Sequence, residues 1–142
     1  AAVLAGWRGT AAGIVRNAVM AMQSNYRSEP GDLIVAIGPA ACGRDYEIGE
    51  DVIQAFEANF SNAGSYLTET RPGHALINLD MANRDQLTSL GVSAQNIFIS
   101  TLCTLERTDL FFSYRREKAR LGKTGRLLSV IGKLSGASPD AS

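Results

Sequence analysis

The chain has 142 residues, of which 45% are hydrophobic and 20% are charged. This composition is typical of a single globular domain and excludes an intrinsically disordered chain. The 14 basic and 14 acidic side chains cancel, so the net charge favours neither nucleic acid nor an anionic membrane. No apolar run approaches the roughly 20 residues of a membrane-spanning helix. We therefore expect no nucleic-acid partner and no membrane partner, and we place the protein in the cytoplasm.

The first third of the chain predicts a strand, a helix and a second strand. The apolar run at residues 1–5 predicts a strand that ends at the glycine-bounded turn of residues 6–9. Thr10 is a candidate N-cap for the helix that follows. The apolar face of this helix contains Ile14, Val15, Ala18, Val19 and Met22. Residues 27–32 predict a loop, and the continuous apolar run of residues 33–37 predicts a strand buried on both faces.

The middle of the chain predicts two helices with a strand between them. After a loop at residues 40–47, a helix over residues 49–60 would turn its apolar side chains inward. Residues 62–73 are polar and predict a loop, and residues 75–79 predict the next strand. Asp80 is a candidate N-cap for a helix over residues 81–90, and Gly91 stands at its C′ position.

The last third predicts a strand over residues 97–102, then short strand candidates at residues 109–114 and 126–131 on either side of a basic stretch at 115–123. Residues 133–142 are small and polar and predict a flexible tail. Strands thus alternate with helices. This order predicts an α+β fold with a mixed α/β sheet and flanking helices, in a single domain over residues 1–132.

The start of the chain indicates that the fold is incomplete. The apolar run begins at the first residue, with neither an initiator methionine nor the basic n-region of a signal peptide. We therefore expect a fragment, a processed product or the product of a shortened reading frame. The two cysteines, Cys42 and Cys103, form no disulfide framework, and we expect both to be reduced.

The motif GWRGT at residues 6–10 is the first candidate site. An apolar strand is predicted to run into a glycine-bounded turn and then a helix, whose first N–H groups lack intrahelical partners. Arg8 adds a planar, permanently charged donor, so a phosphate or a carboxylate could bind here. The alternative is a tight strand–helix turn, with Trp7 in the core and Arg8 paired with a carboxylate.

Two later segments are further candidates. The loop GPAACGRDYE at residues 38–47 follows a buried strand, where α/β folds place their sites. There Arg44 and Tyr46 could line a pocket or simply tie the loop down. The segment FFSYRR at residues 111–116 combines rings on which a base could stack with guanidinium groups, Arg115 among them, that could meet a phosphate. Its alternative is a core strand with solvated arginines.

Metal ligands and nucleophiles are scarce. A cysteine without a neighbouring histidine, such as Cys42, is more often inert than catalytic. Cys103 follows a predicted strand, where a thiol is more often a small buried group. His74 is the only histidine, and one histidine with two distant cysteines is a poor zinc set, since structural sites use four ligands and catalytic sites three.

Taken together and in order, these motifs resemble those of the YfiH-like family. They are AGWRGT at residues 5–10, IGPA at 37–40, YEIG at 46–49, LD at 79–80, AN at 82–83, QL at 86–87, CT at 103–104, FFSYRR at 111–116 and TGR at 124–126. Their order and approximate spacing match the family over about residues 1–132. The resemblance identifies the chain as the C-terminal portion of a single YfiH-like domain.

The resemblance implies a fold and a function. The fold would be similar to the catalytic domain of cytotoxic necrotizing factor. Members are described as purine nucleoside phosphorylases with adenosine deaminase activity, which act on adenosine, inosine and methylthioadenosine. Older descriptions name copper and a polyphenol oxidase or laccase activity, and some members are tied to peptidoglycan editing. The family's active site is a zinc site made of His, Cys and His.

The resemblance also implies that this chain lacks the metal site. Leu4 stands where the family has its last histidine, directly before AGWRG, and the other two ligands lie upstream of residue 1. Leucine has no lone pair to offer a metal, so we expect no catalytic zinc and little turnover. Arg8, Arg44 and Arg115 remain candidate contacts for a purine nucleoside or phosphate.

Three hypotheses stay open for the function. The first is a zinc-dependent purine nucleoside phosphorylase and adenosine deaminase, impaired here by the loss of ligands. The second is a catalytically inactive fragment or a module that binds a purine or an anion. The third is a peptidoglycan-editing, amidase-like hydrolase. The missing N-terminal segment or a second copy of the chain are the candidate protein partners.

Overall fold

A computed structural model describes residues 1–132 of the chain. Within them the helices are α1 (Trp7–Ala11), α2 (Ile14–Tyr26), α3 (Glu50–Asn59), α4 (Leu79–Ser89) and α5 (Tyr114–Leu121). The strands are β1 (Val35–Ile37), β2 (Glu47–Gly49), β3 (Leu67–Arg71), β4 (His74–Ile77) and β5 (Ile97–Ile99). Single 3₁₀ turns lie at Pro30–Asp32, Ala63–Ser65 and Ala94–Asn96. This mixture of helices and strands confirms the predicted α+β class.

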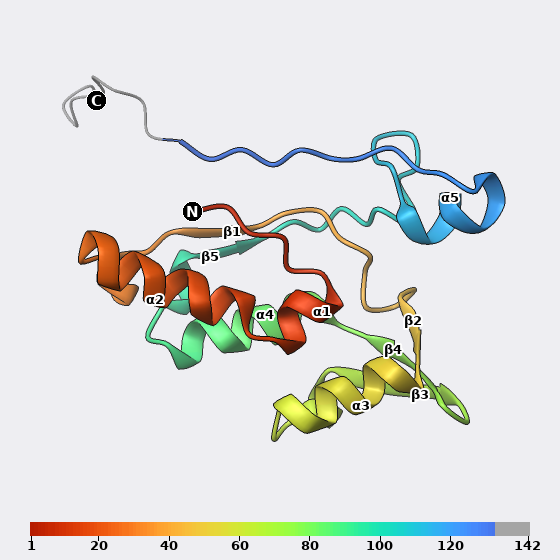
Figure 1. Cartoon of the computed structure of the whole chain (residues 1–142), viewed down its shortest axis with the longest axis horizontal. Helices are drawn as coiled ribbons and strands as arrows, with labels where there is room; N and C mark the ends of the chain where they lie inside the picture. Colours follow the sequence, from red (N-terminus) through yellow and green to blue (C-terminus); the bar gives the residue numbers. More distant parts are fainter. Residues whose placement is uncertain (133–142) are drawn as a thin grey trace.

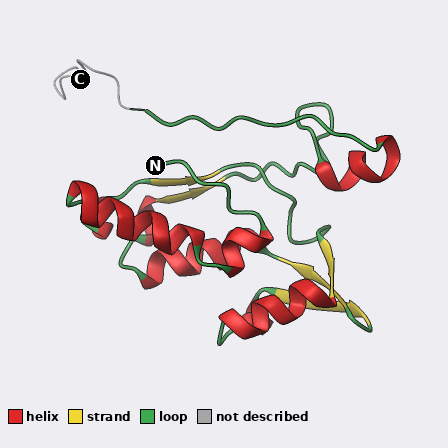
Figure 2. Ribbon diagram, viewed as in Figure 1, coloured by secondary structure: helices red, strands yellow, loops and turns green. Residues whose placement is uncertain are grey.

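The strands form two separate sheets (Figures 1 and 2). In the first, β1 pairs in parallel with β5, with Ala36 opposite Phe98. In the second, β4 lies between β2 and β3 and is antiparallel to both. Helices α2 and α4 lie beside the parallel pair, whereas α3 lies against the antiparallel sheet (Figure 1). Helix α5 follows the loop beyond β5 and stands apart from the other helices.

Two apolar clusters hold these layers together. The larger lies between α3, the antiparallel sheet and the start of α4; its buried members are Ile48, Val52, Phe56, Ala63, Tyr66, Ala75, Ile77, Leu79 and Ala82. The smaller lies between α2, α4 and the parallel pair; its buried members are Val15, Val19, Leu87 and Val92. The spacing of these residues explains the helices, because positions four apart on α2 and α3 lie on one face.

The residue pattern of α3 explains why this segment is helical. Val52 and Phe56 stand four residues apart and are both buried. Glu50 and Asp51 occupy the first turn, where carboxylates interact favourably with the helix dipole. Phe56 is fully buried and stacks on Phe60 just beyond the helix, with ring centroids 5.1 Å apart. The predicted helix over residues 49–60 is therefore confirmed to within a residue at each end.

In the first half of the chain, the structure contradicts one predicted strand, one predicted cap and the predicted burial of another strand. Residues 1–5 form no strand, because no neighbouring strand among the described residues pairs with them. Thr10 lies inside α1 and does not cap a helix, since its hydroxyl contacts the Ala5 carbonyl and the Asn83 side chain. The strand at residues 33–37 is not buried on both faces, because Ile34 is 74% exposed.

Other differences concern the second half. Residues 62–73 contain the edge strand β3, whose side chains are mostly exposed and therefore polar. Asn78 rather than Asp80 caps α4, because the Asn78 side chain accepts a hydrogen bond from the Met81 amide at 3.0 Å. Residues 109–114 and 126–131 form no strand, and the basic stretch forms α5 instead. Gly91 has the expected positive φ of 91° beyond α4.

No described helix is both long enough and apolar enough to cross a membrane. The tail predicted for residues 133–142 lies outside the described residues.

Candidate functional site

The GWRGT motif forms the short helix α1, and its second glycine allows a close contact with the preceding chain. A Cβ on Gly9 would lie 2.9 Å from the backbone oxygen of Leu4, which is closer than carbon and oxygen approach without a shift. Residues 4 and 5 can therefore pass directly over α1 only because residue 9 is glycine. Helix α1 has five residues, so the long helix expected directly after residue 10 begins instead at Ile14.

A buried polar network fixes α1 on α4. Thr10 is fully buried, and its hydroxyl lies 3.1 Å from the Ala5 carbonyl oxygen and 3.2 Å from Asn83 Oδ1. Asn83 Nδ2 donates to the Leu79 carbonyl at 2.8 Å, and Gln86 Nε2 donates to the Thr10 carbonyl at 3.0 Å. Pairing of these buried groups favours this arrangement over one that separates α1 from α4, and Gln86 Oε1 is the one buried side-chain atom among the described residues that has no partner. The network thus sets the position of Trp7 and Arg8 relative to the core.

Two aromatic residues from distant segments are anchored on the same apolar cluster. Trp7 and Tyr46 are both partly buried, and both pack against the larger core cluster. The guanidinium carbon of Arg8 lies 4.2 Å from the centre of the Trp7 ring, and that of Arg115 lies 5.4 Å from the centre of the Tyr46 ring. Both distances are within the range of a cation–π contact. Residues from α1, the β1–β2 loop and α5 therefore contribute to one surface, which we call the Arg8–Arg115 site.

The position of Arg115 depends on how α5 is held. Ser113, which precedes α5, donates its amide to Glu117 Oε1 at 3.3 Å, and Thr124 donates its hydroxyl to Glu117 Oε2 at 2.6 Å. The hydrogen bond from Thr124 is the main cause that lowers the pKa of Glu117. A Cβ on Gly125 would lie 2.5 Å from the Phe112 ring. The TGR motif thus folds back against α5 and fixes the first turn, which carries Arg115.

Two guanidinium groups and one carboxylate act on Tyr46. Burial raises the pKa of Tyr46, the nearby positive charges of Arg115 and Arg8 oppose the rise, and the negative charge of Asp51 adds to it. Both guanidinium groups are therefore close enough to Tyr46 to lower its pKa. Among the described residues, the salt bridges of arginine involve Arg44, Arg71 and Arg107, and none involves Arg8 or Arg115. Two exposed guanidinium groups without carboxylate partners can bind an anion.

Arg44, the third predicted contact, lies in a different environment. Its Nε donates to Glu106 Oε1 at 2.9 Å, its Nη2 contacts the same oxygen, and Asp45 lies 3.8 Å away. The hydrogen bond that Arg44 donates to Glu106 is the main cause that raises the pKa of Arg44. Within the described part of the chain, then, two carboxylates already face Arg44. The structure brings Arg8 and Arg115 together but turns Arg44 towards Glu106.

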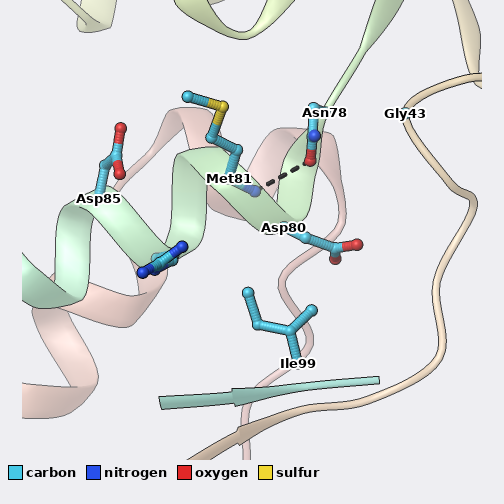
Figure 3. Close-up of a pocket in the computed structure, with 7 residues that line it drawn as sticks. Gly43, Asn78, Asp80, Met81, Asp85 and Ile99 are labelled. Atoms are coloured by element: carbon cyan, nitrogen blue, oxygen red, sulfur yellow. Dashed lines mark hydrogen bonds between the residues drawn. The ribbon is translucent and has the colours of Figure 1, made fainter. Parts of the chain in front are cut away.

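A cavity of about 380 Å³ lies between α4 and the loop that carries Arg44. Asp80 projects from α4 towards Gly43, and Ile99 of β5 lies beneath it (Figure 3). Burial raises the pKa of Asp80. A Cβ on Gly43 would lie 2.9 Å from the Asn78 side chain, so only glycine lets the loop approach α4 this closely. Since the lining holds two carboxylates and one guanidinium, it favours an anion less than the Arg8–Arg115 site does.

The described residues do not fit the zinc site that the family resemblance implies. Leu4 is 91% exposed and has no donor atom. His74 lies in β4 of the other sheet, with Nδ1 3.2 Å from the Pro72 carbonyl oxygen. The one cluster of metal-binding side chains among residues 1–132 is Cys42, Asp45, Cys103 and Glu106. It contains no histidine and does not include the Leu4 position.

Comparison with known proteins agrees with the family that the sequence motifs indicate. A family model described as multi-copper polyphenol oxidoreductase laccase matches residues 1–133. The chain belongs to this YfiH-like family. It is 38% identical over 130 residues to the purine nucleoside phosphorylase YlmD of Geobacillus stearothermophilus, a match that covers 91% of this chain and 46% of YlmD. It is also 38% identical over 133 residues to a purine nucleoside phosphorylase of Bacteroides thetaiotaomicron, covering 92% and 48%.

Solved structures support the same assignment. The crystal structure of Bacillus licheniformis YfiH matches with a TM-score of 0.75 at 30% identity, over 81% of this chain and 43% of that one. The structure of Geobacillus YlmD matches with a TM-score of 0.73 at 37% identity, over 80% and 42%. The chain thus spans about half the length of the family members that it matches. The predicted family and its partial coverage are confirmed.

Sequence reasoning missed Asp45 and Glu106, which the structure places beside Cys42 and Cys103. A signal was present in the sequence, because each acidic residue follows a cysteine by three positions. The sequence also gave no sign that Arg8 and Arg115 both lie near Tyr46. No local pattern gives that proximity, since the three residues come from segments far apart in the sequence.

Proposed function

We propose that the chain contributes the nucleoside- and phosphate-binding surface of a YfiH-like purine nucleoside phosphorylase, and that it binds these ligands without turning them over by itself. The observation that supports this most strongly is the convergence of Arg8 and Arg115 on Tyr46. Phosphorolysis needs a phosphate held next to the sugar carbon, which is a task for guanidinium groups. The partly buried rings of Trp7 and Tyr46, each with a guanidinium beside it, are the aromatic groups on which a purine could stack once the arginine moves towards phosphate.

The names of the relatives support the ligand class. YlmD and the Bacteroides protein are named purine nucleoside phosphorylases, which act on a purine nucleoside and phosphate. Arg8 and Arg115 lie inside the part of the chain that matches them. We propose adenosine deamination and zinc dependence only for family members that have the His, Cys and His ligands, and not for this chain. Here Leu4 offers no donor atom at the position of the family's last histidine.

A fluorescence titration tests ligand binding. Trp7 is the only tryptophan and lies 4.2 Å from the Arg8 guanidinium, so its emission reports on this surface alone. Inosine with phosphate should change the emission with saturation. Arg115→Gln should weaken binding about tenfold or more, since a hydrogen bond to a charged group contributes about 1.5–3 kcal/mol.

Matched controls separate the site from general charge. Arg120→Gln changes an exposed arginine of the same helix that lies beyond the Tyr46 contact, and it should leave the affinity unchanged. Equilibrium dialysis replaces fluorescence for Arg8→Gln, because that substitution also alters Trp7; its control is Arg16→Gln on α2. Equal losses in site and control variants would mean that binding is non-specific and would overturn the proposal.

Turnover is measured separately. The chain is incubated with adenosine or inosine and phosphate, with and without zinc, and the products adenine, inosine and hypoxanthine are separated by chromatography. We expect binding without product. Zinc-dependent product would show that a catalytic site assembles without the family ligands, and our account of Leu4 would be wrong.

A further inference from the structure

We infer that Cys42, Asp45, Cys103 and Glu106 form a binding site for a soft divalent transition metal, with zinc as the expected ion. One donor atom from each of these residues lies within 4.8 Å of every other. In a tetrahedral zinc site with bonds of about 2.0–2.3 Å, the donors would be roughly 3.3–3.8 Å apart. A contraction of about 1 Å therefore converts the present cluster into a coordination shell.

The cluster is built from two matching turns. Asp45 follows Cys42 by three residues, and Glu106 follows Cys103 by three residues. In both turns the amide four residues later donates to the cysteine carbonyl: that of Tyr46 to Cys42 at 3.0 Å and that of Arg107 to Cys103 at 2.9 Å. One turn of this kind brings side chains three residues apart to the same side, which is why zinc ligands occur in pairs at short spacing.

The fold brings the two turns together. They follow β1 and β5, which are parallel neighbours, and a further bridge pairs Ala40 with Cys103. The Thr104 amide donates to the Ala40 carbonyl at 2.9 Å, and the Cys42 amide lies 3.3 Å from Cys103 Sγ. The site thus lies at the carboxyl ends of a parallel pair, where α/β folds place ligands.

The Cys42 amide points at the Cys103 sulfur, with 3.3 Å between nitrogen and sulfur. The Cys103 side chain is only 1% exposed. Burial alone would raise its pKa, but hydrogen bonds from the Cys42 side chain and from the backbone amides of Cys42, Leu105 and Glu106 outweigh burial, so the pKa lies below its ordinary value. Amide donors that point at sulfur stabilise a metal-bound thiolate in the same way.

Cys42 holds the proton that a metal would replace. Its thiol donates to Asp45 Oδ2 at 3.0 Å. Burial and the hydrogen bond to Asp45 raise its pKa to about 12. When a divalent ion binds, the Cys42 sulfur exchanges its proton for the metal and the proton passes to solvent, with no change in oxidation state. The groups that face this sulfur are Asp45, Cys103 and Arg44.

The remaining charge favours a cation. The two carboxylates carry two negative charges, whereas Arg44 supplies one positive charge. Arg44 Nε and Nη2 both donate to the same oxygen, Glu106 Oε1. The other carboxylate oxygen, Oε2, is therefore the one that would bind a metal. Mixed thiolate and carboxylate donors suit zinc better than magnesium or calcium. Four protein donors make a closed, structural site, which would hold the loop that carries Tyr46.

A competition titration tests the site. The reduced, metal-free chain is titrated with zinc against a chromophoric chelator, and with cobalt(II) to detect thiolate charge-transfer absorption. We expect one equivalent of zinc per chain. Asp45→Asn and Glu106→Gln, both exposed and so without large effects on folding, should weaken zinc at least tenfold. Cys42→Ser and Cys103→Ser should abolish the cobalt–thiolate band.

A carboxylate outside the cluster supplies the control. Glu57→Gln on α3 should bind zinc like the unchanged chain, and circular dichroism should verify that all variants are folded. Absence of stoichiometric zinc, an affinity equal in all variants, or a cobalt complex without a thiolate band would overturn the inference. None of these outcomes depends on nucleoside binding.

Discussion

Replacing Thr10 by valine tests how the GWRGT motif is held. Valine keeps the branching and nearly the volume of threonine but removes the hydroxyl that contacts the Ala5 carbonyl and Asn83 Oδ1. Thr10 is fully buried, so water cannot replace the lost partner. A buried acceptor left without its donor costs about 1–3 kcal/mol. We therefore expect Thr10→Val to lower the free energy of unfolding by about 1–3 kcal/mol.

Urea unfolding followed by circular dichroism measures this change. The midpoint should fall while the slope with urea stays the same, because the surface exposed on unfolding is unaltered. Thr68→Val is the matched control, since Thr68 is exposed on the edge strand β3, and its effect should stay within about 0.5 kcal/mol. If both variants unfold at the same midpoint, the Thr10 hydroxyl does not stabilise α1 on α4, and the reasoning about the motif is refuted.

Three further predictions follow from separate contacts. Gly43→Ala should lower the unfolding midpoint, because its Cβ would lie 2.9 Å from the Asn78 side chain; an unchanged midpoint would show that the loop does not approach α4. The Thr124 hydrogen bond holds the pKa of Glu117 below its ordinary value, so its stabilising effect is present at neutral pH and is lost as the pH falls through the folded pKa. Glu117→Gln should therefore flatten the acid limb of a stability–pH curve, and an unaltered limb would contradict this. Finally, Phe98 is 60% exposed on the open face of the parallel pair, so the chain should self-associate in sedimentation experiments and Phe98→Lys should reduce association; a monomeric parent chain would refute the idea.

The sequence predicted the elements that have a strong internal period. Helices α3 and α4 show apolar positions three and four apart, and their predicted bounds agree with the structure to within two residues. Gly91 marked the end of α4 because only a residue tolerant of positive φ suits that position. These signals are local, so they can be recognised without knowledge of the tertiary fold.

The elements that failed depend on tertiary contacts. Strand β3 is an edge strand with polar, exposed side chains, so its composition is that of a loop. Residues 1–5 are apolar, yet a strand needs a neighbour to pair with, and the described residues supply none. The segment FFSYRR suggested a strand by its aromatic residues, but Glu117 and Thr124 instead stabilise a helix that begins at Tyr114.

The candidate site was predicted in part for the same reason. Arg8 and Arg115 were identified from local motifs, whereas their common neighbour Tyr46 could be assigned only once the fold placed three segments together. Arg44 was identified by the same kind of motif, and only the structure shows that Glu106 faces it. The family resemblance gave the order of motifs but not their contacts.

The central claim is that Arg8 and Arg115 belong to one nucleoside- and phosphate-binding surface beside Tyr46. Chemical shifts of the isotope-labelled chain, titrated with inosine and phosphate, test it most directly because they locate binding residue by residue. We predict saturable shifts at the Trp7 indole, at Tyr46 and at Arg115. A second groove, between α3 and the antiparallel sheet and lined by Glu50, Glu57 and Glu69 among others, should be unchanged. Shifts confined to that groove, or no saturable shifts at any concentration up to the solubility of inosine, would contradict the account.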